Sequence, residues 1–550
     1  MRSSPDSARP AAHPDRDAGE GYRAPHPLTA LFVPLERLLV TGGDGRLAVS
    51  PDDQLNAYGC RPFPRPEAHA FASSTASTIS ERAYARAECA RESLIAASLS
   101  AGIEEAFDMR LEAMRHELKK VLNISGSSVE IVFAPSGTDS QLHALFAARA
   151  VLAGPITNVV VAADQTGSGT VFTAGGRHFS DRTALNTNVE RGEAIAGLAD
   201  GVESVRIGIT DDSGELRDPA TIDAAVESAV AQAIAHGRRV VLQAMDRSKF
   251  GRRAPSRDCL KTICARWPDA VQVVIDACQA RLSAKRISAY IERNHIVLLT
   301  GSKFFSGPPF SSAMLVPRRV SVTLAQADPP PGFRDYSACS DWPKAWPRLR
   351  QQLPRQMNFG MWLRWEAALA EMHAYFAVPP SAREAVLDRF SAAVTVRLAA
   401  SPSLELLPEQ ERDASDDLDD EEMGTRTIFP FLLRHQDRLL PRDACTAIYR
   451  ALNRDMAAGL PSSAGTQDRW LARQLCHIGQ PVPLPAANGI TTAALRINAS
   501  ARLVSDCWTP DPFATYGNVV NQFEQVSVTL EKIEMLLAQI PHIDDWKGTP

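Results

Sequence analysis

Runs of apolar residues, each short and nearly continuous, alternate with helical patterns through the middle of this 550-residue chain. Strands made almost entirely of apolar residues are buried on both faces, as in parallel sheets whose crossover connections are helices. The pattern therefore predicts an α/β fold with a mostly parallel central sheet and helices on both faces, in one large domain over residues 120–320. The expected strands are residues 130–133, 159–162, 239–244, 271–275, 296–300 and 313–316.

The remaining segments are arranged around this large domain. Residues 1–27 are rich in Pro, Ala, Asp and Arg, so a disordered leader is expected. Residues 28–119, strand- and turn-like at first and then helical, are expected to pack on the large domain. Residues 321–376 are expected to form a loop excursion and a linker helix. Residues 377–550 then form a smaller α+β domain, in which the acidic insertion 409–422 is expected to be a solvated loop.

Composition narrows the classes of partner and the cellular setting. The formal net charge is -5, which gives no electrostatic reason to expect nucleic acid as a partner. No apolar run reaches the roughly 18 residues of a membrane span, so no membrane association is expected. The nine cysteines are scattered without a CxxC pair, which predicts neither a disulfide framework nor a metal site. Reduced thiols in a cytoplasmic protein are the expectation.

Residues suited to chemistry follow three of the expected strands, and the first set is Ser136-Gly137-Thr138-Asp139. This small, glycine-containing turn opens an expected helix. Free N–H groups and the positive end of the helix dipole make such a position suitable for a phosphate. The alternative is an ordinary helix cap formed by Thr138 or Asp139.

The other two sets supply a carboxylate and an amine. Asp276 ends an apolar strand, where a carboxylate can keep a pyridine nitrogen protonated; the alternative is a helix cap. Lys303 lies in Thr300-Gly301-Ser302-Lys303, among small and apolar residues. A lysine in such surroundings can lose its proton and attack an aldehyde, and the hydroxyls of Thr300 and Ser302 can donate to phosphate oxygens. The alternative is an ordinary surface lysine.

The order of a phosphate turn, then Asp-x-x-Gln, then Thr-Gly-Ser-Lys resembles the fold-type I pyridoxal 5'-phosphate (PLP) enzymes. Within them it is most similar to the class V aminotransferase and cysteine desulfurase group, over about residues 131–317. The resemblance implies PLP as cofactor, with Lys303 as its Schiff-base lysine and proton shuttle. It places Asp276 on the pyridinium nitrogen and Gln279 near the 3-oxygen. The other contacts that it implies are Gly137, Thr138, Thr300 and Ser302 to the phosphate and Ser248 to the cofactor.

The resemblance also implies a substrate contact and an assembly. Arg496 lies in the short expected strand Ala494-Leu495-Arg496-Ile497-Asn498. In the group, an arginine in such a strand grips the substrate carboxylate, for which a bidentate guanidinium is well suited. The alternative is an ordinary surface arginine. A homodimer is implied as well, since active sites of the group generally lie at a dimer interface.

Two features differ from the group and bear on the reaction. None of Cys445, Cys476 and Cys507 lies in a convincing Gly/Ser-rich loop, so persulfide chemistry is not expected. In the group, an aromatic or histidine ring from the segment corresponding to 163–169 stacks on the cofactor. This segment has no aromatic residue here, which leaves Gln165, Thr166 or backbone to cover the face of the cofactor ring.

The function expected is a PLP-dependent enzyme that transforms an amino acid through an external aldimine, with transamination as the first choice. A PLP-dependent lyase, acting by C–S or α,β-elimination or by decarboxylation, stays open. So does a catalytically inactive, structural or regulatory PLP-fold protein. A nucleotide-binding α/β domain is disfavoured by the lack of a Walker lysine motif or a GxGxxG turn.

Overall fold

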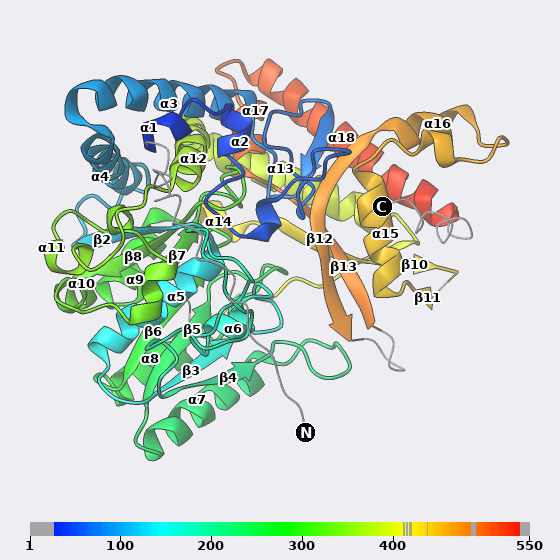
Figure 1. Ribbon diagram of the computed structural model, residues 1–550. Helices are drawn as coiled ribbons and strands as arrows, with labels where there is room; N and C mark the ends of the chain where they lie inside the picture. Colours follow the sequence, from blue (N-terminus) through cyan, green and yellow to red (C-terminus); the bar gives the residue numbers. More distant parts are fainter. Residues whose placement is uncertain are drawn as a thin grey trace, which may run out of the picture.

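The computed structural model contains two sheets, each packed against helices (Figure 1). It describes residues 27–410, 413, 416, 421–436, 438–485 and 491–539. The leader expected at residues 1–27 therefore lies, except for Pro27, outside the described residues.

The first sheet has seven strands in the order β2-β8-β7-β6-β5-β3-β4. The neighbours from β7 to β4 are parallel, and β8 is antiparallel to both β2 and β7. The predicted α/β fold with a mostly parallel sheet is thereby confirmed. The strands are β2 (Val129–Ala134), β3 (Ile156–Val161), β4 (Val202–Ile207), β5 (Arg239–Met245), β6 (Val271–Ala277), β7 (Ile296–Thr300) and β8 (Ser312–Pro317).

Helices cover both faces of this sheet, because alternate residues of each strand enter two different cores. Ile275 of β6 packs into a core with α7, α8, α9 and α12, whereas its neighbour Val274 packs into a core with α5 and α10. Side chains of a strand alternate between faces, so one continuous apolar run supplies both cores. The helices are α5 (Gly137–Val151), α7 (Pro219–Ala235), α8 (Arg257–Arg266), α9 (Ala284–Glu292), α10 (Arg318–Leu324) and α12 (Phe359–Ala377).

The second sheet follows the order β1-β12-β13-β10-β11, with β9 on β10, and most of its pairs are antiparallel. Helices pack against it, which confirms the α+β character of the C-terminal domain (Figure 1). Its elements are β9 (Leu404–Leu406), β10 (Ile428–His435), β11 (Arg438–Leu439), β12 (Leu475–Pro485), β13 (Thr491–Asn498), α13 (Pro380–Ala399), α14 (Glu421–Gly424), α15 (Arg442–Leu452), α16 (Thr466–Arg473), α17 (Ala501–Cys507) and α18 (Pro512–Ala538).

The N-terminal segment supplies a strand to the second sheet and helices to the core of the first. Its strand β1 (Ala68–Phe71) pairs in parallel with β12 of the second sheet. Its long helices α3 (Glu81–Ala101) and α4 (Ile103–Val121) pack against α12 and the first sheet's core. The strand-like expectation for residues 28–59 is wrong, because this part forms the short helices α1 (Pro27–Ala30), α2 (Leu35–Leu38) and η1 (Gly45–Leu47).

The segment that precedes α12 is part of the core. Trp342 and Trp346 are buried in the cluster that covers α5, so the expected loop excursion packs firmly on the large domain. Its short helices are η2 (Pro331–Asp335), η3 (Cys339–Asp341) and α11 (Pro347–Arg350).

The described part of the acidic insertion contacts the large domain. Asp416 forms ion pairs with Arg286 at 2.7 Å and with Arg257 at 3.2 Å, and its side chain is 8% exposed. Asp413 accepts the backbone N–H of Arg257 at 3.0 Å. These two residues are therefore docked and not solvated; most of the other residues of 409–422 lie outside the described ones.

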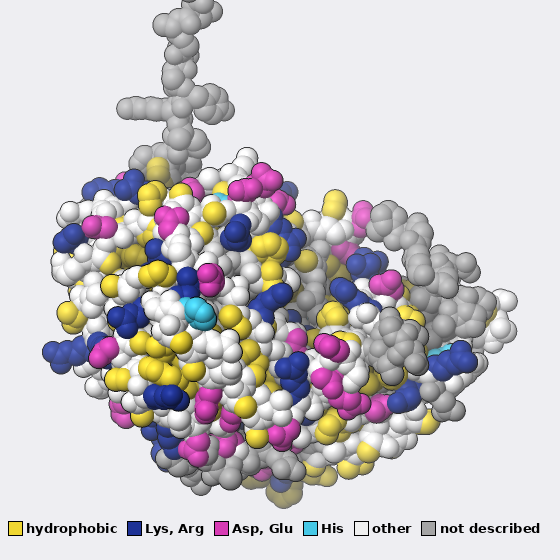
Figure 2. Space-filling model, turned by 90° about the horizontal axis from the view of Figure 1, so that it is seen from below, with side chains coloured by type: hydrophobic (Ala, Val, Ile, Leu, Met, Phe, Trp, Pro, Cys, Tyr) yellow, Lys and Arg dark blue, Asp and Glu magenta, His cyan; other side chains and the backbone are white. Residues whose placement is uncertain are grey.

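The surface and the cysteines complete the description. Figure 2 shows a face of the molecule on which basic and acidic side chains are interspersed. Among the described helices, none has both the length and the apolar character that crossing a membrane requires. All nine cysteines are free thiols.

Candidate active site

Three parallel strands end side by side where the predicted site residues lie. Asp276 on β6 is in register with Met245 of β5 and Leu298 of β7. Ligands of open α/β sheets bind at this carboxyl edge of the strands. The edge therefore gathers Asp276, the turn that follows β5 and the loop that carries Lys303.

The N-terminus of α5 faces the same edge. Ser136 caps the helix in a reciprocal capping box with Asp139. The N–H groups of Gly137 and Thr138 head the helix, where no intrahelical acceptor exists for them. A Cβ on Gly137 would lie 3.0 Å from the Sγ of Cys278, so glycine allows close approach to the end of β6. The position suits an anion.

The acid in this capping box does not oppose an anion strongly. Burial raises the pKa of Asp139 to about 7, and its Oδ1 has no hydrogen-bond partner in the described structure. Near pH 7 Asp139 is therefore protonated about half of the time, which weakens its repulsion toward a bound phosphate.

Arg46 places a guanidinium, paired with Asp44, at the start of α5, and no pattern in the sequence predicted it. Its Nη2 lies 3.5 Å from Ser136 Oγ and 2.6 Å from a carboxylate oxygen of Asp44. The guanidinium lies 4.8 Å from the ring centroid of Phe310, which holds it in place. Its segment was expected only to form a turn, and tertiary packing brings it here.

The carboxylate of Asp276 is fixed by two donors. Its Oδ1 accepts the N–H of Cys278 at 3.1 Å, and its Oδ2 accepts the Gln141 amide at 3.4 Å. Gln141 is itself oriented by the hydroxyl of Thr173, which donates to its Oε1 at 2.8 Å. A buried, oriented carboxylate at a strand end can pair with a protonated ring nitrogen.

Lys303 lies in a tightly packed loop. The N–H of Gly307 donates to the Gly301 carbonyl at 2.9 Å, and that of Ser306 donates to the Lys303 carbonyl at 2.8 Å. Phe304 beside it is fully buried. Lys303 is partly buried, and within the described residues its side chain has no hydrogen bond or ion pair. A lysine that is held rigidly yet has no partner is free to bind a ligand.

Three other predicted residues also lie at this edge. The hydroxyl of Thr300 donates to the Cys278 carbonyl at 2.6 Å, so its proton is already used in this arrangement. The Oγ of Ser248 accepts the N–H of Arg252 at 3.2 Å and shapes the turn after β5, but its own proton is available. Ser302 is buried, 7% exposed.

Gln279 connects the edge to the N-terminal segment. Its amide donates to the Ser74 carbonyl at 3.1 Å, and its Oε1 accepts from Arg281 at 2.8 Å. One N–H of the amide is left for a ligand.

Arg496, on β13 of the second sheet, is 2% exposed, so it is not a surface arginine. Its Nη2 donates to Thr75 Oγ1 at 2.9 Å and to the Gln480 carbonyl at 2.7 Å. Its Nε and Nη1 are buried without a partner in the described part of the chain. A buried guanidinium with unsatisfied donors and no carboxylate is suited to bind an anionic ligand.

The sequence analysis did not single out Lys249. Lys249 lies in the turn that follows β5, and its Nζ donates to the Thr166 carbonyl at 2.6 Å. A signal for it existed, because the tripeptide Ser-Lys-Phe occurs at 248–250 as well as at 302–304, each time just after a strand of the same sheet.

Gln165 lies in the segment that lacks an aromatic ring. Both polar atoms of its amide are buried with no partner among the described residues. The same segment packs on α5, since a Cβ on Gly169 would come 2.5 Å from Thr138 Cγ2. The amide of Gln165 thus has both polar atoms available for a ligand.

This packing makes a testable prediction. We expect Gly169→Ala to lower the free energy of unfolding by about 1–3 kcal/mol, because the stiff side chain of Thr138 cannot move away freely. Gly126→Ala is the matched control, since nothing lies within 4 Å of the added methyl; its effect should stay within about 0.5 kcal/mol. Urea denaturation measures both, and equal effects would contradict the close approach.

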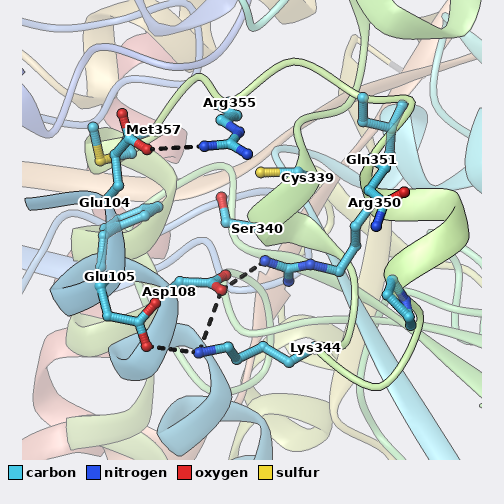
Figure 3. Close-up of a pocket in the computed structure, with 13 residues that line it drawn as sticks. Glu104, Glu105, Asp108, Cys339, Ser340, Lys344, Arg350, Gln351, Arg355 and Met357 are labelled. Carbon is cyan, nitrogen blue, oxygen red and sulfur yellow. Dashed lines mark hydrogen bonds and ion pairs between the residues drawn. The ribbon is translucent and has the colours of Figure 1, made fainter.

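A separate pocket of about 440 Å³ lies between α4 and the segment before α12 (Figure 3). Its charged groups neutralise one another: Lys344 contacts Glu105 at 2.9 Å, and Arg350 contacts Asp108 at 2.6 Å. It shares no residue with the strand edge described above, and its paired charges leave no reactive group comparable to Lys303.

Comparisons with known proteins give a limited likeness. No protein-family model and no curated protein matches the chain. The chain is similar to the solved structure of mouse CSAD in apo form (14% identity, 91% of this chain, 97% of that chain, TM-score 0.47). It is similar to a glutamate decarboxylase domain from Vibrio parahaemolyticus (16% identity, 86% of this chain, 81% of that chain, TM-score 0.44). It is also similar to Oryza sativa TDC with PLP and tryptamine (13% identity, 84% of this chain, 84% of that chain, TM-score 0.45). At these values the likeness assigns neither a family nor a reaction to this chain.

Proposed function

We propose that the chain is a PLP-dependent enzyme that transforms an amino acid, and that it is an aminotransferase. The observation that carries the proposal is the partnerless amine of Lys303 at the same strand edge as the oriented carboxylate of Asp276. Between them they offer the two groups that a pyridine aldehyde needs, a nucleophile and a partner for the ring nitrogen.

The residues present fit this cofactor. Gly137 and Thr138 would hold its phosphate by their backbone N–H groups, with the charge of Arg46 close by. Asp276 would hold the ring nitrogen, and the unsatisfied amide of Gln165 would offer further hydrogen bonds to the bound group. When bound, PLP supplies an electron sink for charge that develops at the substrate's Cα.

The protein's own side chains would handle binding and proton transfer. Arg496 would bind the substrate carboxylate through its free Nε and Nη1 donors, which fixes the orientation of Cα. Lys303 would remove and return the proton at the substrate's Cα. Arg496 is buried, which strengthens its electrostatic interactions with a bound carboxylate.

The test is turnover of the PLP-loaded protein with a panel of amino acids, with and without a keto-acid acceptor. Turnover that needs the acceptor supports transamination. Product formed without an acceptor, as CO₂ or as pyruvate with a released leaving group, would replace transamination by a lyase reaction. A protein that binds PLP and turns over no amino acid would favour a catalytically inactive, structural or regulatory role.

We also propose a homodimer in the cytoplasm, with an amino acid as the small-molecule partner. The resemblance to the fold-type I group supports the dimer, and the nine free thiols support a reducing compartment. Light scattering of the purified protein should give a molar mass about twice that of one chain; a mass equal to one chain would contradict the dimer.

A further inference from the structure

The two sheets meet where Lys249 lies. Phe250, the next residue, leaves the first sheet and is buried in a small cluster with Val482 of β12 and Ala494 of β13. Ala494 and Arg496 are two residues apart on one strand, so their side chains share a face. Phe250 therefore packs on the face of β13 that carries Arg496, and this anchors Lys249 close to that arginine.

Several charged side chains lie near Lys249. Burial, together with the nearby charges of Arg496 and Lys303, lowers the pKa of Lys249 to about 7. The carboxylates that act in the other direction are Asp164 and Asp276.

Those two carboxylates accept hydrogen bonds from neutral donors and form no ion pair with Lys249 or Arg496 in the described structure. Asp164 accepts the N–H groups of Ile209 and Thr210 at 3.0 and 3.1 Å. Asp276 is held by Gln141 and a backbone N–H, as described above.

Three basic side chains, Lys249, Arg496 and Lys303, thus face two carboxylates at this site. In the described ranges neither Lys249 nor Arg496 forms an ion pair. The surface of Figure 2, by contrast, mixes both signs, and the chain as a whole is acidic. One bound carboxylate would satisfy Arg496 and leave Lys249 without a counter-charge, which points to a second anionic group on the ligand.

We propose that Lys249 and Arg496 together select an amino acid with an acidic side chain, with the α-carboxylate on Arg496 and the side-chain anion on Lys249. This rests on the proposed function, since it takes the ligand to be an amino acid. Lys249 uses one ammonium hydrogen on the Thr166 carbonyl and has two left for the anion. The two cations come from different sheets, so a ligand with two acidic groups would bridge them.

The first test compares ligands of equal size on the PLP-loaded protein. Aspartate and asparagine, and glutamate and glutamine, are titrated while the visible spectrum of the bound cofactor is followed. We expect the acids to bind about 10- to 100-fold more tightly than the amides, because a hydrogen bond to a charged group changes an affinity by about this factor. Equal binding of acid and amide would overturn the inference while leaving the proposed function intact. A protein that takes up no PLP would instead overturn the proposed function.

Variants of Lys249 then assign the preference. Lys249→Met keeps the length of the side chain and should abolish the preference for acids without weakening the binding of amides. Lys249→Arg keeps a positive charge and should retain part of the preference for acids. A preference for acids that survives Lys249→Met, in protein whose melting temperature is unchanged, would overturn the role of Lys249.

Proton uptake gives an independent measure that needs no variant. At about pH 8 the amine of Lys249 is mostly neutral in the free site, and a bound anion raises its pKa, so it takes up a proton. Aspartate should therefore bind with close to one more proton taken up than asparagine does. At about pH 5.5 the amine is already charged and the difference should vanish. Calorimetry in buffers of different ionisation enthalpy measures the number of protons taken up on binding. Equal proton uptake for aspartate and asparagine at about pH 8 would count against the inference.

Discussion

Lys303→Ala is expected to abolish the visible absorbance that we predict for the PLP-loaded protein and to lower turnover about 10⁴-fold, the upper end of what a positioned acid–base group contributes. The reason is that Lys303 is both the proposed covalent attachment point and the proposed proton carrier. Its side chain has no hydrogen bond or ion pair in the described structure, so its removal should cost little stability. Absorbance, steady-state kinetics and a thermal melt of the same sample measure the three effects.

The chain offers a matched control for this variant. Lys249 lies in an identical Ser-Lys-Phe tripeptide, after a strand of the same sheet. Lys249→Met should keep the absorbance band that Lys303→Ala loses. A band that survives Lys303→Ala, or that is lost only in Lys249→Met, would contradict the assignment of Lys303.

Arg496→Ala is expected to raise KM roughly 30- to 5,000-fold, because removing one partner of a buried charged pair costs about 2–5 kcal/mol. The kcat should change much less, since the guanidinium binds substrate and does not take part in proton transfer. The cofactor band should persist. Steady-state kinetics over a wide substrate range separate the two constants.

Arg496→Lys tests the geometry of the same contact. It keeps the charge but replaces the planar guanidinium by a single ammonium. The KM of this variant should therefore lie between those of the native protein and Arg496→Ala. An unchanged KM in Arg496→Ala would contradict the carboxylate role. Loss of the band would show instead that Arg496 supports the fold around the cofactor, through its bonds to Thr75 and Gln480.

Much of the first sheet could be predicted because its inner strands are continuous apolar runs. The strand β4 was missed because it lies at the sheet edge and its residues, such as Glu203 and Arg206, are largely solvent-exposed. The pairing of β1 with β12 was also missed. His69 and its partner Cys476 lie far apart in the sequence, and no local pattern encodes such a contact.

The candidate site also contains some residues that could be predicted from the sequence and others that could not. Asp276 and Lys303 could be brought together from the sequence, because neighbouring parallel strands end at one edge. Arg46 and Thr75 belong to the N-terminal segment, and only its tertiary packing places them there. Lys249 was within reach of sequence reasoning through its repeated tripeptide, but its approach to Arg496 depends on the packing of Phe250 against the second sheet.

The central claim is that Lys303 is the residue that carries the cofactor. The most direct measurement is reduction of the PLP-loaded protein with borohydride, followed by proteolysis and mass spectrometry of the peptides. We expect a single pyridoxyl-phosphate label on Lys303 and an unmodified Lys249. A label on Lys249, or no labelled lysine after loading with PLP, would contradict the account.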